Sequence, residues 1–271
     1  MHPILFEIGG FPVYTYGVLL AAAYLLGLQF ALWRAKSRGL DPNRVMDLGI
    51  WIIVSALVGA KLLLLIVEWD TYGRNPAELM TLVRSGGVFY GGLIVAVLVA
   101  FWYMWRHRLP LWSVSDIFAP GIALGHVIGR MGCFFAGCCF GKETSVPWAI
   151  TFTSEYAARN VGTPINRPLH PTQLYEAGAE LLILVFLIAT ERKGRPFAGR
   201  TFWGYMLLYG ISRFIIEFYR GDVRGTVGMF STSQFVSLLI VPISVVMLIL
   251  LARRQQPAPA PHSAAAARRA A

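Results

Sequence analysis

Residues 46–67 read MDLGIWIIVSALVGAKLLLLIV and contain only two charged side chains, Asp47 and Lys61. A helix of roughly 20 mostly apolar residues crosses the hydrocarbon core of a bilayer, so this stretch is predicted to span a membrane. Six more stretches have the same character, although glycine and proline interrupt one of them. They cover residues 13–33, 88–105, 113–131, 174–190, 201–219 and 233–251. The sequence therefore predicts an all-α integral membrane protein with about seven transmembrane helices.

The composition argues against a soluble domain. The chain of 271 residues is 56% hydrophobic and 14% charged, and its mean hydropathy is +0.58. A soluble domain carries charges at roughly a quarter of its positions. The net charge of +10 comes mostly from short connections between the apolar stretches, where basic residues act as orientation signals. We therefore expect membrane lipid as a partner and no nucleic acid.

The distribution of Lys and Arg predicts the orientation in the membrane. One alternate set of connections carries 14 of these residues, and the other set carries 7. Because basic residues in short loops stay in the cytoplasm, the N-terminus is predicted outside and the C-terminus inside. Residues 1–10 lack the basic start of a cleavable signal peptide, so the first apolar stretch is expected to remain in the mature protein.

The chain is predicted to form one polytopic transmembrane domain over residues 1–254. A long outer loop is expected at about 132–173, between the fourth and fifth spans, where four prolines make regular structure rare. Residues 255–271 are rich in Ala and Pro. Such a composition buries too little apolar surface to become ordered, so we expect a disordered cytoplasmic tail.

Ionisable side chains inside predicted spans are candidates for function, because each costs about 3 kcal/mol on insertion scales. The sixth span contains Tyr209, Arg213 and Glu217 at intervals of four, followed by Arg220. This spacing places the side chains on one helical face. Glu217 can neutralise Arg213. The helix alone is equally compatible with a structural ion pair that joins two helices.

A second candidate is the sequence GRMGCF at residues 129–134, where Arg130 is expected to end the fourth span. A glycine-rich turn is predicted to follow, with Gly132 in it and Gly141 downstream. Glycines allow a backbone to approach a ligand closely, and the planar guanidinium suits phosphate oxygens. The alternative is an interfacial arginine whose charge reaches toward water.

The predicted orientation brings several polar residues to one depth. Arg130 and Arg213 both fall at the outer ends of their spans. A phospholipid phosphate lies at that depth, and two arginines could hold it. Other residues predicted at the same level are Tyr14, Tyr16, Tyr90, Gly91, Gly92, His170, Gln173, Tyr175 and Glu176.

Short motifs in this order and spacing resemble the prolipoprotein diacylglyceryl transferase family. The likeness runs from about residue 6 to residue 220. Its motifs are Tyr16-Gly17, Gly59–Lys61, Phe89–Leu93, Gly129–Gly132, His170–Glu176 and Tyr209–Glu217.

The resemblance implies a multi-pass enzyme of the bacterial inner membrane whose active site faces the periplasmic side. The donor would be phosphatidylglycerol, and the acceptor would be the lipobox cysteine thiol of a prolipoprotein signal peptide. The product would be a thioether, with glycerol phosphate as the leaving group. No cofactor and no metal are expected.

The resemblance also implies roles for individual residues. Arg130 and Arg213 would bind the phosphate and stabilise the charge that develops on the leaving oxygen, while Glu217 and Tyr209 would hold Arg213. The predicted catalytic residues are Arg130, Arg213, Tyr16, Tyr90 and Glu217. The predicted substrate-binding residues are Arg130, Arg213, Tyr209, Gly132, Gly141, His170, Gly91 and Gly92.

The sequence departs from the family pattern at the position of Tyr90, where the family carries a histidine. The acceptor thiol must lose its proton, since thiolate is the nucleophile. A tyrosine with an ordinary pKa near 10 is mostly protonated at neutral pH. The sequence therefore leaves the general base unidentified.

A second departure introduces three cysteines. Cys133 and Cys138, with Ala136, stand where the family pattern has two Asn and one Glu, and Cys139 follows directly. We favour small, soft packing residues. The alternatives are a disulfide across the loop and a redox or metal centre with His126 or His170.

Two other functions are compatible with parts of the pattern. A transporter or flippase for an anionic lipid or solute would explain the buried arginines. Transport usually requires polar groups along a path and often paired repeats, whereas here the polar groups gather on one side and no repeat is evident. A membrane thiol oxidoreductase would use the cysteines, but the chain has no Cys-x-x-Cys pair.

Overall fold

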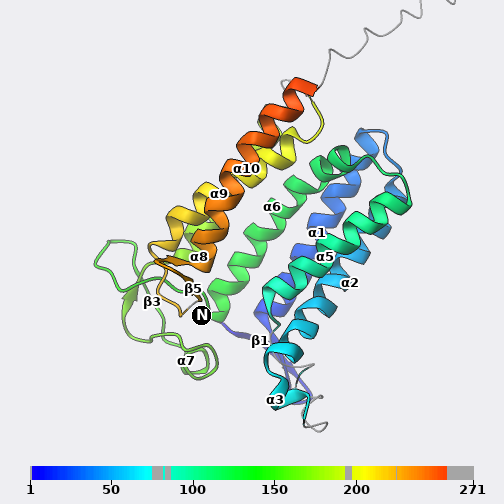
Figure 1. Ribbon diagram of the computed structural model, residues 1–271. Helices are drawn as coiled ribbons and strands as arrows, with labels where there is room; N and C mark the ends of the chain where they lie inside the picture. Colours follow the sequence, from blue (N-terminus) through cyan, green and yellow to red (C-terminus); the bar gives the residue numbers. More distant parts are fainter. Residues whose placement is uncertain (1, 75–81, 83–86, 193–196, 224, 255–271) are drawn as a thin grey trace, which may run out of the picture.

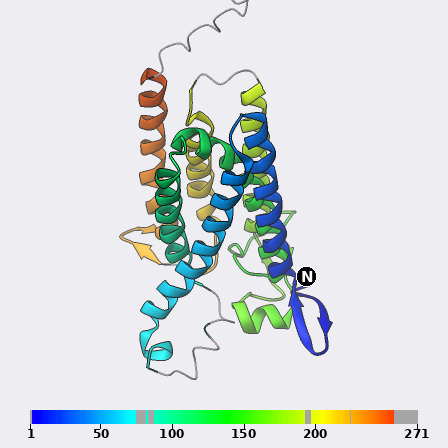
Figure 2. The same ribbon diagram turned by 90° about the vertical axis from the view of Figure 1, so that its right-hand side faces the viewer.

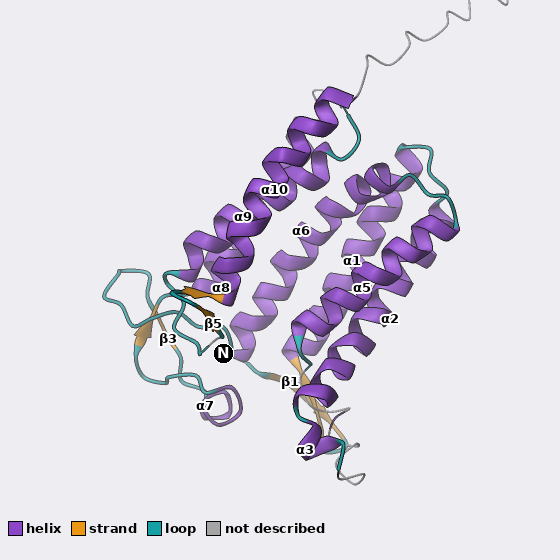
Figure 3. Ribbon diagram, in the orientation of Figure 1, coloured by secondary structure: helices purple, strands orange, loops and turns teal. Residues whose placement is uncertain are grey.

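Long helices dominate the computed structural model, which describes residues 2–74, 82, 87–192, 197–223 and 225–254 (Figures 1 and 3). Each of the seven predicted spans coincides with one long helix. These helices are α1 (Thr15–Ser37), α2 (Pro42–Val67), α5 (Phe89–Arg106), α6 (Leu111–Ala136), α8 (Thr172–Arg192), α9 (Arg200–Glu217) and α10 (Thr232–Arg254). The prediction of an all-α multi-pass membrane protein is confirmed.

Six of these helices are long and apolar enough to cross a membrane: α1, α2, α5, α6, α8 and α10, within the residues that the structure describes. Helix α9 is as long as α5, but Arg200, Arg213 and Glu217 make it more polar. It nevertheless packs along both α8 and α10. Seven crossings therefore remain a prediction, which holds if α9 also crosses the membrane.

Helix α6 is the centre of the bundle, where it contacts α1, α8 and α9 (Figures 1 and 2). Helices α2 and α5 form a second tightly packed pair, and α9 pairs with α10. Glycines allow these close approaches. A Cβ on Gly27 of α1 would lie 2.8 Å from the Gly121 carbonyl oxygen of α6. Small residues at such crossings are typical of membrane helices, because van der Waals packing drives their association.

A buried apolar cluster joins α6, α8 and α9. It contains Ala119, Ala123, Ile183, Leu184, Leu187 and Tyr205. These side chains fix the three helices that also carry the buried charges described below. The outward faces of α2 and α5 expose large apolar residues such as Leu57 and Leu98, as expected for surfaces in lipid.

The short elements lie at the end of the bundle where the chain begins, and α10 ends at the opposite end (Figures 1 and 2). An odd number of crossings would place the two termini in this way. The short elements are the hairpin β1 (Ile4–Ile8) and β2 (Phe11–Tyr14), α3 (Trp69–Tyr72), the paired strands β3 (Ile150–Thr151) and β4 (Pro168–Leu169), α7 (Glu155–Val161), and the paired strands β5 (Thr226–Val227) and β6 (Phe230–Ser231).

The predicted glycine-rich turn directly after Arg130 is wrong. Helix α6 continues to Ala136 and ends at Gly137, whose φ is 83°. Gly132 lies inside the helix, where a Cβ would come within 3.2 Å of the Tyr16 ring. Its small size therefore serves the packing of α6 on α1. The connection to α8 covers residues 137–171 and contains β3, α7 and β4, and the predicted tail at 255–271 lies outside the described residues.

Candidate active site

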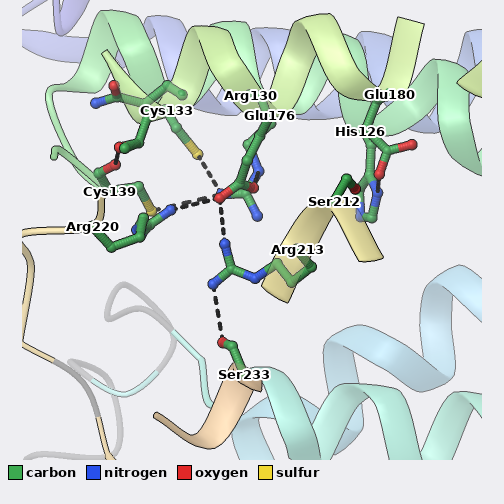
Figure 4. Close-up of polar contacts among 12 residues, drawn as sticks. His126, Arg130, Cys133, Cys139, Glu176, Glu180, Ser212, Arg213, Arg220 and Ser233 are labelled. Carbon is green, nitrogen blue, oxygen red and sulfur yellow. Dashed lines mark hydrogen bonds and ion pairs between the residues drawn. The ribbon is translucent and has the colours of Figure 1, made fainter. Parts of the chain in front are cut away.

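Three arginines converge on the carboxylate of Glu176, in the first turns of α8 (Figure 4). Arg130 of α6 forms an ion pair with it, in which Nε lies 2.5 Å from Oε2. Arg213 of α9 donates from Nη1 to Oε1, and Arg220, just beyond α9, donates to the same oxygen at 2.8 Å. Arg130 and Arg213, which the sequence places at one depth, therefore both contact the Glu176 carboxylate, although they belong to different helices.

The charges of this cluster are buried and balanced. Glu176 is 5% exposed, and Arg213 is 6% exposed. A buried ion without a partner costs several kcal/mol, and each arginine here has one. Arg220 also binds Asp222 through two N···O contacts of 2.8 Å. With Glu217 on Arg213, three guanidinium groups face three carboxylates.

The predicted ion pair between Arg213 and Glu217 is present in α9. Arg213 Nη2 lies 2.7 Å from Glu217 Oε2. This is a charge contact rather than a well-directed hydrogen bond, because that oxygen accepts no hydrogen bond with suitable geometry. Ser233 of α10 accepts a hydrogen bond from the same Nη2 at 3.0 Å. Arg213 is thus held by α8, α9 and α10 together.

Arg130 has its remaining donors next to sulfur. Its Nη1 lies 3.9 Å from Cys133 Sγ and 3.7 Å from Cys139 Sγ. The three cysteine sulfur atoms lie within 4.8 Å of one another, and the structure records them as thiols rather than as a disulfide. Sulfur is a weak acceptor. Arg130, whose side chain is 20% exposed, therefore keeps donor capacity for a stronger acceptor such as a phosphate oxygen.

The start of α8 fixes the loop that carries two of the cysteines. Thr172 Oγ1 donates to the Cys139 carbonyl, and Gln173 Nε2 donates to the Cys138 carbonyl, both at 2.8 Å. Thr172 and Gln173 are completely buried. Hydrogen bonds from the other two thiols, together with Arg220 and Arg130, lower the pKa of the Cys139 thiol.

Three other predicted residues lie around this cluster. Tyr16, in the first turn of α1, lies against Gly132 of α6. Gly141 donates its backbone N–H to the His170 carbonyl at 3.0 Å, and a Cβ there would lie 2.9 Å from the Tyr219 carbonyl oxygen. His170 Nδ1 lies 3.1 Å from the Tyr175 hydroxyl. Gly141 and His170 thus lie where the loop crosses the ends of α8 and α9.

Tyr90, Gly91 and Gly92 lie on the first turn of α5. A Cβ on Gly92 would lie 2.7 Å from the Ala56 carbonyl oxygen of α2, so close helix packing accounts for this glycine. Tyr90 is 37% exposed and packs against the ring of Phe89. In the part of the chain that the structure describes, no hydrogen bond joins Tyr90 to the arginines. The predicted roles of these three residues stay predictions.

Tyr209 packs against a second polar layer. Its ring centroid lies 5.4 Å from that of His126 and 5.8 Å from that of Tyr205. No hydrogen bond joins its hydroxyl to Arg213 among the described residues. The predicted support of Arg213 therefore comes from Glu217 and Glu176.

Sequence reasoning missed the central role of Glu176 and the contacts that join His126 to Glu180 and Tyr205 in the second layer. His126 Nδ1 lies 2.7 Å from Glu180 Oε1, and the Tyr205 hydroxyl lies 3.0 Å from the same ring nitrogen. A four-residue interval on each helix was the available signal: His126 precedes Arg130, Glu180 follows Glu176, and Tyr205 precedes Tyr209. Residues at this interval share a helical face.

A family model described as prolipoprotein diacylglyceryl transferase matches residues 3–250. The match covers both polar layers and all seven long helices up to most of α10. The chain belongs to the prolipoprotein diacylglyceryl transferase family. The recognition made from the sequence motifs is thereby confirmed.

Relatives of similar length support the same assignment. A protein of Clostridium tetani is 37% identical over 245 residues, which cover 90% of this chain and 96% of the relative. One of Finegoldia magna is 34% identical over 249 residues, covering 92% and 95%. One of Clostridium perfringens is 33% identical over 240 residues, covering 89% and 91%. All three are named phosphatidylglycerol–prolipoprotein diacylglyceryl transferase, the last with the number 2, so the family is one of transferases.

Proposed function

We propose that this chain transfers a diacylglyceryl group from phosphatidylglycerol to the lipobox cysteine thiol of prolipoprotein signal peptides. A thioether forms, and glycerol phosphate leaves. The observation that carries the proposal is the convergence of Arg130 and Arg213, from different helices, on one buried carboxylate. The names of the relatives supply the two substrates.

Glu176 holds the three guanidinium groups together through its ion pairs. It contacts Arg130 through Nε, and the terminal nitrogen Nη1 faces only sulfur, a weak acceptor that a phosphate oxygen can replace. These donors are in place before the reaction, so they need no reorganisation when charge builds on the leaving oxygen. Removing one preorganised donor of this kind lowers a rate by about 10²–10³.

The arginine cluster is also suited to a lipid by its position. It lies near the end of α6 and the beginning of α8. This end of the bundle carries the hairpin, β3 and α7 (Figure 1), and a headgroup meets the end of the apolar helices there. The bias of Lys and Arg toward the connections at the other end supports a periplasmic position for the cluster. We place the protein in the bacterial inner membrane with seven crossings, α9 included.

The test uses the purified full-length chain in detergent with phosphatidylglycerol and a lipobox peptide. Mass spectrometry is expected to show one added diacylglyceryl unit on the peptide cysteine. Arg130→Ala is expected to slow transfer by about 10²–10³. Arg213→Lys keeps the charge but loses the planar fork, and it is expected to slow transfer in the same direction.

The control is Arg159→Ala on α7. Arg159 is exposed and forms an ion pair with Glu155, four residues away, so its loss is expected to leave the rate unchanged. Equal rates for wild type and Arg130→Ala would contradict the assigned role. Movement of phosphatidylglycerol between leaflets, without any mass gain on the peptide, would instead support a transporter. Measurable transfer by a triple Cys→Ser variant would exclude a route through these thiols.

A further inference from the structure

A second polar layer lies one helical turn from the arginine cluster, farther from the end of the bundle. Figure 4 shows His126 and Glu180 beside Arg130 and Glu176 along the same two helices. Four residues of α-helix correspond to a rise of roughly 6 Å. His126 therefore lies at about that distance from Arg130 along α6, toward the middle of the helix.

The layer combines a buried carboxylate with an accessible imidazole. The Glu180 side chain is 4% exposed, whereas that of His126 is 36% exposed. Glu180 contacts Nδ1 of the ring at 2.7 Å. A carboxylate on one ring nitrogen fixes the orientation and tautomer of a histidine, so Nε2 is the nitrogen left to accept a proton.

The second polar layer lies at the depth in the membrane that is expected for the glycerol carbon–oxygen bond that must break. A lipid phosphate held by Arg130 has its acyl chains on the side of the bilayer centre. The glycerol carbon that is attacked lies on that side of the phosphorus, and the incoming thiol approaches it from the side opposite to the leaving oxygen. The second layer is therefore on the side from which the thiol approaches.

Other candidate bases near the arginines are already engaged. Glu176 forms ion pairs with three guanidinium groups, and Glu217 contacts Arg213. The oxygens of both carboxylates are thus occupied by guanidinium groups and face away from an incoming thiol proton. His126 lies one turn from Arg130 on the same helix, and its imidazole is accessible from outside the protein.

We propose that His126, oriented by Glu180, accepts the proton of the acceptor thiol in the transfer reaction. This inference rests on the proposed function. The S–H proton moves to His126 Nε2, the sulfur forms a bond to the glycerol carbon, and the carbon–oxygen bond to the phosphate breaks. The electron pair leaves with the phosphate oxygen, and the imidazolium later returns its proton to water.

The charged and titratable groups around His126 come from three helices. They are Glu180 on α8, Tyr205 and Tyr209 on α9, and Arg130 on its own helix. Among the described residues, no hydrogen bond, ion pair or ring contact joins it to α1. Glu180 is the carboxylate in direct contact with the ring.

The test compares two acceptor peptides that differ in one atom, cysteine and selenocysteine. The selenol is ionised at neutral pH and needs no base. For His126→Gln, the rate with the cysteine peptide is expected to fall by about 10²–10⁴, with the KM for phosphatidylglycerol unchanged. The rate with the selenocysteine peptide is expected to fall less than about tenfold. Glu180→Gln is expected to give the same pattern with a smaller loss.

His107→Gln, at the other end of the bundle, is the matched control, and thermal unfolding in detergent checks that each variant is folded. Equal losses on both peptides would assign His126 a structural role and overturn the inference. Wild-type rates in a folded His126→Gln variant would overturn it as well. A wild-type protein that modifies neither peptide would overturn the proposed function together with this inference.

The three cysteine sulfurs carry a second, independent inference. Cys133 lies in the last turn of α6, and Cys138 and Cys139 lie in the loop that Thr172 and Gln173 fix. Their sulfur atoms lie within 4.8 Å of one another. Zinc–thiolate bonds of roughly 2.3 Å place sulfur atoms about 4 Å apart, which this arrangement can reach with small side-chain movements.

The surroundings match the charge of such a complex. Three thiolates around a divalent cation carry one net negative charge, and Arg130 lies next to two of the sulfurs. We infer that these thiols bind a thiophilic divalent cation such as Zn²⁺, releasing three protons. Three protein ligands leave the fourth tetrahedral position open.

The test titrates the reduced full-length protein with Cd²⁺ as a probe. A thiolate-to-metal absorption band in the ultraviolet, saturating at one equivalent, is expected. Zn²⁺ is expected to displace the probe, and Cys138→Ser is expected to weaken binding at least tenfold. Absence of the band, or equal Cd²⁺ binding by a triple Cys→Ser variant, would overturn the inference. Neither result bears on the transferase assay.

Discussion

Two clusters of buried arginine and glutamate occupy the two ends of the bundle, and they differ in what their arginines have left to bind. At the end opposite the candidate site, Glu191 of α8 accepts from Arg34 at 2.7 and 2.8 Å and from Arg38 at 2.6 Å. The other donors of Arg34 are directed at the carbonyls of Ile117 and Asp116. This end is saturated with strong acceptors.

The saturated end also anchors a helix. The Asp116 carboxylate accepts the backbone N–H groups of Gly199 and Phe202, at 2.7 and 2.8 Å. These groups belong to the start of α9, where a helix has unpaired donors and a carboxylate is favourable. The cluster of Arg34, Arg38, Glu191 and Asp116 thus explains the position of α9 without any ligand.

The candidate site has the same residue types but a different balance. Arg130, Arg213 and Arg220 share Glu176, and the terminal nitrogen Nη1 of Arg130 faces sulfur. The comparison teaches that a buried ion pair does not by itself identify a site. A site is identified by a buried arginine whose hydrogen-bond donors lack strong acceptors within the protein.

The largest expected effect comes from Glu176→Gln. This change keeps the shape but removes the shared anion from three buried guanidinium groups. Breaking a buried ion pair costs about 3–5 kcal/mol, and transfer should be lost as well, because Arg130 and Arg213 are no longer aligned. Thermal unfolding and the peptide assay measure both effects. Intact stability would show that Glu176 does not organise the cluster.

Arg34→Ala tests the cluster at the opposite end of the bundle. It leaves Glu191 partly unpaired, so stability is expected to fall by about 3–5 kcal/mol. Transfer per folded molecule is expected to stay close to wild type, since this cluster lies far from the candidate site. If a folded Arg34→Ala protein transferred the diacylglyceryl group a hundredfold more slowly, the Arg34 cluster could not be purely structural.

Asp116→Ala should have a smaller effect. It removes the carboxylate that caps the start of α9, and loss of such a cap costs about 0.5–2 kcal/mol. Denaturation of the purified protein in detergent measures the difference. A change of 4 kcal/mol or more would mean that Asp116 does more than cap this helix.

Arg159→Ala is expected to have the smallest effect on stability and transfer. Exposed pairs four residues apart contribute about 0.3–0.5 kcal/mol, and Arg159 pairs with Glu155 in this way. Both stability and transfer are expected to match wild type within error. A clear loss of transfer would instead place α7 in substrate binding.

The fold was largely predictable, because the length and polarity of each apolar stretch are local properties. All seven predicted ranges coincide with long helices. The glycine after Arg130 was misread, since a glycine in a membrane helix serves close packing as well as turns. Arg34 and Arg38 were treated as orientation signals, although both are buried in ion pairs.

The site was predictable only where its parts share a helix. The interval of four residues predicted the pair of Arg213 and Glu217. Glu176 was placed at the right depth, but its contacts with Arg130 and Arg213 depend on how α6, α8 and α9 pack. Nothing in the spacing along the chain reports which faces of these three helices meet. The same holds for His126 and Glu180.

The central claim is that Arg130 and Arg213 jointly bind the phosphate of a lipid. Native mass spectrometry of the protein, released from detergent with equal amounts of phosphatidylglycerol and diacylglycerol, tests it most directly. Wild type and Arg34→Ala are expected to retain phosphatidylglycerol preferentially, and Arg130→Ala and Arg213→Lys are expected to lose that preference. An unchanged preference in both of these last variants would contradict the account.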